Sequence, residues 1–186
     1  DLLDPDARTA AQDLADAWDL LVAADARRDP LGPNAGPVRL AYGTTLIACW
    51  ISDTALWLLQ IGDGVAIVAT GAGASRPIPP DEHEGSPETE SLASDAAATR
   101  ARTARVPLTG LPVVVCLTTD GVDAAYPDGG GLLSAVEELR SLAIREGASS
   151  VAELLEPWVR EAAAVSGDDA TVAVAIVTGA DDGRGR

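Results

Sequence analysis

Val113-Val114-Val115-Cys116-Leu117 is a continuously apolar run that ends in Thr118-Thr119-Asp120-Gly121. A run without alternation is typical of a strand buried on both faces, and an Asp-Gly pair is typical of a turn. The same pattern recurs in the opposite order near the C-terminus, where Ser166-Gly167-Asp168-Asp169 precedes the apolar run Val172–Val177. We therefore predict two core strands, each with a carboxylate at one end.

Three further apolar runs lie close together before these two. They are Thr45–Ile51, Ala55–Ile61 and Val65–Ala69, separated by the turn residues 52–54 and 62–64. Connections this short favour antiparallel neighbours within one sheet. The sequence therefore predicts antiparallel sheets whose strands are covered on both sides.

Helical spacing appears in two parts of the chain. Residues 6–28 carry apolar side chains on one face, which predicts an amphipathic helix. Two more helices are predicted between the last two strands, joined at residues 147–149 and therefore antiparallel. Sheets that need covering and helices with one apolar face predict an α+β fold, a four-layer α-β-β-α sandwich of antiparallel sheets.

One long segment, residues 71–108, shows no sustained hydrophobic periodicity. It contains several prolines and the acidic stretch Asp81-Glu82-His83-Glu84. We interpret it as a long surface loop that acts as a flap over a substrate, and the alternative is a solvated loop without such a role. Residues 179–186 are expected to form a disordered tail. The chain has 186 residues, so residues 1–178 are interpreted as one domain.

Composition excludes several classes of function. The formal net charge is -16, and so acidic a surface repels nucleic acid and anionic lipid. The apolar runs fall short of the roughly 20 residues that a membrane helix needs. The two cysteines, Cys49 and Cys116, lie in separate apolar runs, as buried thiols do, and this favours a reducing, cytoplasmic location.

Three aspartates share the setting of a strand end beside a glycine: Asp63, Asp120 and Asp168. If their strands are neighbours, the three carboxylates repel one another unless a cation lies between them. Oxygen ligands suit magnesium or manganese better than zinc, which prefers nitrogen or sulfur. The alternative is that these aspartates are ordinary turn residues that neither bind a metal nor take part in a reaction.

Four motifs, in order, resemble the metal-dependent protein phosphatases, the protein phosphatase 2C family. They are Tyr42-Gly43-Thr44-Thr45-Leu46, Gln60-Ile61-Gly62-Asp63-Gly64, Leu117-Thr118-Thr119-Asp120-Gly121-Val122 and Ser166-Gly167-Asp168-Asp169-Ala170-Thr171-Val172. Glu88-Thr89-Glu90-Ser91-Leu92 also resembles a segment of the bacterial, especially actinobacterial, branch.

The resemblance implies an α-β-β-α sandwich with two Mn²⁺ or Mg²⁺ ions at one end. It implies that Asp120 and Asp168 are metal ligands and that Asp63 helps to hold a third, looser ion. Gly62, Gly121, Asp169 and Thr171 would support the site, with no catalytic residue beyond the metal ligands. The implied reaction is attack of metal-activated water on a phosphoserine or phosphothreonine of a protein substrate. A serine/threonine kinase would have phosphorylated that substrate.

The family's first two motifs, which supply an aspartate that bridges both metals and an arginine that clamps phosphate, have no counterpart in Asp1–Ala41. We therefore expect the family's N-terminal strands to be missing from the chain as given. Without that aspartate and that arginine, this stretch alone is expected to be less active than the full family domain. The alternative function is a non-catalytic, phosphatase-like module that regulates or binds a phosphoprotein.

Overall fold

The computed structural model describes residues 5–32, 36–80 and 90–179, which fall into two compact units. The first unit takes residues 1–51, 57–63 and 78–105, and the second takes residues 52–56, 64–77 and 106–186. Each unit is thus assembled from stretches that lie far apart in the sequence. The assignment of residues 1–178 to a single domain stays a prediction.

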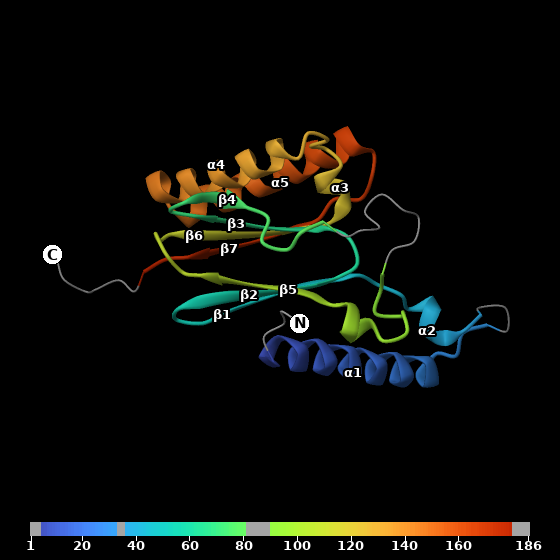
Figure 1. Cartoon of the computed structure of the whole chain (residues 1–186). Coiled ribbons are helices and arrows are strands. Elements are labelled where there is room, and N and C mark those ends of the chain that lie inside the picture. The colour runs from blue at the N-terminus through green and yellow to red at the C-terminus, as the bar shows by residue number, and fades with distance from the viewer. Residues whose placement is uncertain (1–4, 33–35, 81–89, 180–186) are drawn as a thin grey trace. The chain divides into compact units, whose positions relative to one another are not determined.

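The first unit consists of a three-stranded sheet with a long helix along one face (Figure 1). Its elements are α1 (Pro5–Arg28), α2 (Val38–Ala41), the short 3-10 helix η1 (Ala97–Arg100), the strand β1 (Leu46–Ile51), and all but two residues each of the strands β2 (Ala55–Ile61) and β5 (Arg102–Pro107), in the order β1-β2-β5. The helix predicted over residues 6–28 is confirmed. Ala11 and Ala15 of α1 pack with Leu59 and Ile61 of β2, so burial of this one apolar face holds the helix on the sheet.

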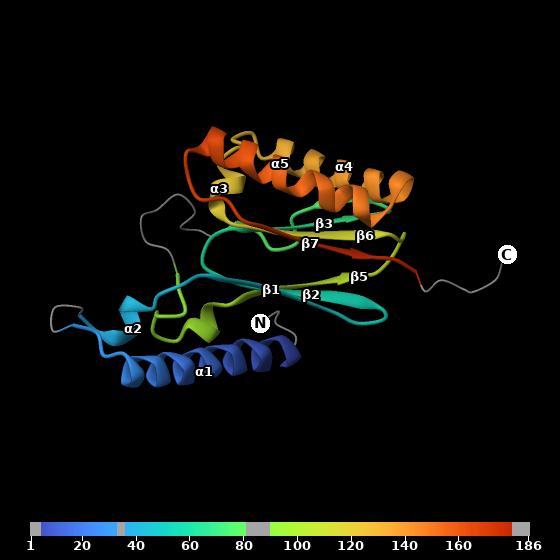
Figure 2. The same ribbon diagram turned by 180° about the vertical axis from the view of Figure 1, so that it is seen from behind.

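The second unit consists of a four-stranded antiparallel sheet with three helices. Its elements are β3 (Val65–Thr70), β4 (Gly73–Ser75), β6 (Val113–Thr118), α3 (Asp120–Asp123), α4 (Gly130–Glu146), α5 (Ala148–Ser166) and β7 (Val172–Val177), with strand order β4-β3-β6-β7. Figures 1 and 2 show α4 and α5 side by side over one face of this sheet. The predicted antiparallel helix pair is confirmed, with Gly147 alone between the two helices.

Alternate residues of the central strands form the core beneath these helices. Val65 and Ile67 of β3 and Val114 and Cys116 of β6 pack together with Val136 of α4. Ala66 and Val68 of β3 and Val113 and Val115 of β6 are buried as well, as the unbroken apolar runs predicted, whereas the edge strand β7 is only half-buried. The fold class is confirmed: two antiparallel sheets with helices make an α+β protein, and each unit supplies a sheet with its helices.

Two expectations about connectivity are wrong. The turn Gly62-Asp63-Gly64 does not join neighbours, because β2 belongs to the three-stranded sheet and β3 to the four-stranded one. The segment 71–108 is not wholly irregular, since it contains β4, η1 and β5. Such short or polar strands are specified by their neighbours more than by their own pattern.

Parts of two other expectations lie outside the described residues. They are the acidic stretch at 81–84 in the middle of the proposed flap and the tail from residue 180, so both stay predictions. Among the described residues, no helix is long and apolar enough to cross a bilayer.

Cys116 gives a first test of the packing. It is fully buried in the second unit's core, and burial raises its pKa from the ordinary value of 9.0 to about 12. The thiolate fraction near neutral pH is therefore about 1000-fold below that of a free thiol. We expect iodoacetamide at pH 8, followed by mass spectrometry, to leave Cys116 unmodified in the native chain and to modify it in urea. Rapid native labelling of Cys116 would contradict the packing.

Candidate active site

Two of the three predicted aspartates lie at the same edge of the second unit's sheet. Strands β6 and β7 pair antiparallel with Thr118 opposite Val172, so the end of β6 lies beside the start of β7. Asp120 follows this register point by two residues, and Asp168 precedes it by four. The turn after one strand and the turn before the next therefore meet.

Gly121 shows how closely the two turns approach. A Cβ atom added to Gly121 would lie 2.3 Å from the backbone oxygen of Asp169 and 3.4 Å from Cβ of Asp168. Real Cβ atoms do not come so near to a carbonyl oxygen. Glycine at position 121 thus allows the Asp120 turn to rest directly on the Asp168-Asp169 turn, so these two predicted aspartates lie on adjoining turns.

Hydrogen bonds extend the β6–β7 pairing beyond the strand ends. The backbone N–H of Thr119 donates to the backbone oxygen of Thr171 (3.1 Å), and the backbone N–H of Thr171 donates to Oγ1 of Thr119 (2.9 Å). Thr171 therefore bonds to the other turn through its backbone. Thr119 was missed as a site residue because its part depends on β6 and β7 being neighbours.

The carboxylates themselves are held by the backbone at one oxygen. Oδ1 of Asp120 accepts a hydrogen bond from the N–H of Gly121 (3.0 Å), and Oδ1 of Asp168 accepts one from the N–H of Asp169 (2.8 Å). Both side chains are exposed to solvent. A carboxylate has a second oxygen, so each aspartate is oriented yet still accessible to a ligand.

Asp63 belongs to the first unit, where its surroundings are well defined. Its backbone oxygen accepts a hydrogen bond from Nε2 of Gln60 (3.2 Å), which also donates to the backbone oxygen of Gly62 (3.1 Å). Nη2 of Arg102 donates to the same Gly62 oxygen (2.6 Å). The turn that carries Asp63 is thus fixed by a buried glutamine and an arginine.

The donor set at the edge of β6 and β7 suits a hard divalent cation. Asp120 and Asp168 offer carboxylate oxygens, the ligands that magnesium and manganese prefer, and the close packing at Gly121 keeps their turns in contact. Within residues 5–32, 36–80 and 90–179, no group of three or more acidic, histidine or cysteine side chains is arranged to hold an ion. Among the described residues of the second unit, the geometry therefore places two carboxylates, those of Asp120 and Asp168, on adjoining turns.

Comparison with known families defines what kind of protein carries this arrangement. The sequence matches the family described as protein phosphatase 2C over residues 2–160. The chain therefore belongs to the protein phosphatase 2C family. No curated protein matches the sequence.

Solved structures agree on the fold. The serine/threonine phosphatase Stp1 from Staphylococcus aureus is similar with a TM-score of 0.58 at 14% identity, over 96% of this chain and 71% of that one. A bacterial serine phosphatase is similar with a TM-score of 0.52 at 17% identity, over 74% of this chain and 59% of that one. The chain thus spans less than two thirds of that phosphatase, and likenesses at such low identity establish the fold alone.

Proposed function

We propose that this chain acts as a metal-dependent serine/threonine protein phosphatase. The contact of the Asp120-Gly121 turn with the Asp168-Asp169 turn is the observation that carries the proposal. It places the exposed carboxylates of Asp120 and Asp168 on adjoining turns at one edge of the sheet, and carboxylate oxygens are the donors that a hard divalent cation prefers. Membership of the protein phosphatase 2C family supports a phosphate ester as substrate.

In this proposal Asp120 and Asp168 hold manganese or magnesium through their carboxylates, and Asp63 contributes to a further ion. When bound, such ions lower the pKa of coordinated water and neutralise the charge of the phosphoryl group. The chain itself orients the ligands: backbone N–H groups fix one oxygen of each carboxylate, and Thr119 ties the two turns together. The substrate would be a phosphoserine or phosphothreonine of a cytoplasmic protein that a serine/threonine kinase has modified.

A second candidate function is a phosphatase-like module that binds a phosphoprotein without hydrolysing it. The finding that favours it is that the described residues hold two carboxylates together and no group of three. The two functions predict different metal responses. A catalytic centre is stabilised by manganese, since any ligand of the native state stabilises that state, whereas a binding module without a metal centre is not.

The test combines metal binding with turnover. Asp120→Asn and Asp168→Asn each remove one carboxylate at nearly constant size, while Asp13→Asn makes the same change of charge at an exposed position on α1. In the 186-residue chain, we expect millimolar manganese to raise the Tm of the wild type and of Asp13→Asn, and to leave both site variants nearly unchanged. Hydrolysis of a phosphothreonine peptide should fall by at least about 100-fold in the site variants only.

The outcomes separate the proposals. A wild type that shows neither a manganese-dependent Tm shift nor turnover would favour the non-catalytic module. An equal Tm shift in Asp120→Asn and the wild type would contradict the assignment of Asp120 as a ligand.

A further inference from the structure

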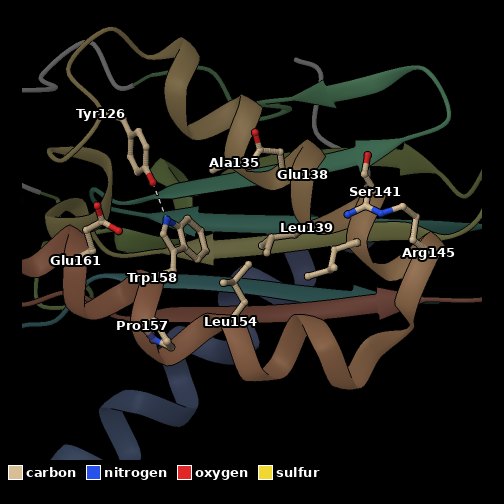
Figure 3. Close-up of a pocket in the computed structure, with 11 residues that line it drawn as sticks. Tyr126, Ala135, Glu138, Leu139, Ser141, Arg145, Leu154, Pro157, Trp158 and Glu161 are labelled. Atoms are coloured by element: carbon tan, nitrogen blue, oxygen red, sulfur yellow. Dashed lines mark hydrogen bonds between the residues drawn. The ribbon is translucent and has the colours of Figure 1, made fainter.

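A groove runs between α4 and α5 in the second unit, apart from the aspartates of the proposed centre (Figure 3). It holds about 440 Å³, which is within the range of binding sites in proteins. Its α4 wall includes Ala135, Glu138, Leu142 and Arg145. Residues separated by three, four and three positions lie on one face of a helix. From Ala135 to Arg145, at 1.5 Å per residue, this face extends roughly 15 Å.

The floor of the groove is apolar and one of its large side chains is poorly covered. Leu139 is buried, but Leu154 keeps 46% of its surface exposed in the middle of the groove. Beside it lies Trp158, whose Nε1–H donates to the hydroxyl of Tyr126 at 2.6 Å (Figure 3). That bond fixes the indole as a rigid wall, so the groove is a preformed apolar channel.

The charges along the groove are separated by sign. Figure 3 shows Glu161 near the end that Tyr126 closes, Glu138 about halfway along the groove, and Arg145 at the other end. A bound segment would therefore meet negative charge over one half of the groove, apolar surface at Leu139 and Leu154, and positive charge at the other end. The formal net charge of -16 adds a long-range attraction for a basic segment.

We propose that this groove binds an amphipathic α-helix of a partner protein. A groove roughly 15 Å long between two antiparallel helices accepts about three turns of a third helix, whose apolar residues at i, i+3 or i+4, and i+7 fill it. The charges orient the guest helix: its basic half lies against Glu161 and Glu138, and its acidic end lies against Arg145. The proposal does not depend on phosphatase activity.

The probe for the test is a helix-stapled peptide of about 14 residues with leucines at i, i+3 and i+7, lysines at one end and a glutamate at the other. It is titrated into the ¹⁵N-labelled 186-residue chain, and the indole N–H signal of Trp158 is followed by NMR. We expect saturable shifts of Trp158 and of its neighbours on α4 and α5. A peptide with glutamates in place of the lysines should bind at least about tenfold more weakly.

Matched variants locate the binding surface. Leu154→Glu places a charge inside the groove, whereas Ile144→Glu makes the change on α4 at a position that is 55% exposed and does not line it. We expect Leu154→Glu to weaken binding at least about tenfold and Ile144→Glu to leave it unchanged. The double change Glu138→Lys with Glu161→Lys should reverse the preference between the two peptides.

Several results would overturn the proposal. They are the absence of a saturable shift with either peptide, equal losses in Leu154→Glu and Ile144→Glu, and an unchanged peptide preference in the Glu138→Lys, Glu161→Lys variant. Concentration-dependent shifts of Trp158 without any peptide would also overturn it, because they would mean that a second copy of the chain occupies the groove.

Discussion

Gly121→Ala is expected to remove the manganese response of the protein and to destabilise the second unit. The added Cβ atom would lie 2.3 Å from the backbone oxygen of Asp169, so the turns that carry Asp120 and Asp168 have to separate. Overpacking against backbone costs about 2–3 kcal/mol, which lowers the Tm of a chain of this size by roughly 4–12 °C. Separated turns also no longer offer two carboxylates to one cation.

Gly130→Ala is the matched control for this variant. Gly130 begins α4, and an added Cβ would meet nothing within 4 Å. Thermal melts with and without manganese measure both effects for each variant. We expect Gly130→Ala to match or slightly exceed the wild type in Tm, because alanine favours a helix, and to keep the manganese shift. A full manganese shift in Gly121→Ala would show that contact between the turns is not needed for binding.

The sequence allows the second unit to be predicted well because its signals are local. The strand at Val113–Thr118 is an unbroken apolar run, and a glycine at 147 marks the junction between the two helices. Such patterns depend on residues within one turn of helix or one strand. Asp120 and Asp168 could be singled out for the same reason, since each stands beside a strand end.

What could not be predicted depends on contacts between distant segments. The turn at residues 62–64 has the length of a hairpin, and only the pairing of β2 with β1 and β5 shows that the chain changes sheets there. Strand β5 contains two arginines and has no apolar pattern, so its pairing with β2 is what makes it a strand. The bond from Thr171 to Thr119 likewise requires knowledge of which strands are neighbours.

Gly62→Ala, in the first unit, is the second substitution that we expect to destabilise the protein strongly. Its φ angle is +87°, and an added Cβ would lie 2.3 Å from the backbone oxygen of Glu90 and 2.5 Å from Cγ2 of Thr45. The left-handed backbone costs a side chain about 1–2 kcal/mol, and the forced contacts cost about 1–3 kcal/mol more. We therefore expect Gly62→Ala to lower the free energy of unfolding by roughly 2–5 kcal/mol, measured by urea denaturation.

Gly73→Ala separates the two causes, because Gly73 also has a positive φ, +109°, but an added Cβ there would meet nothing within 4 Å. Gly73→Ala should lower the free energy of unfolding only by the cost of the left-handed backbone, about 1–2 kcal/mol. The difference between the two variants then measures the close approach of Thr45 and Glu90 to the turn that carries Asp63. Equal losses in both would mean that backbone strain alone makes glycine necessary at position 62, and that the turn can move away from Thr45 at little cost.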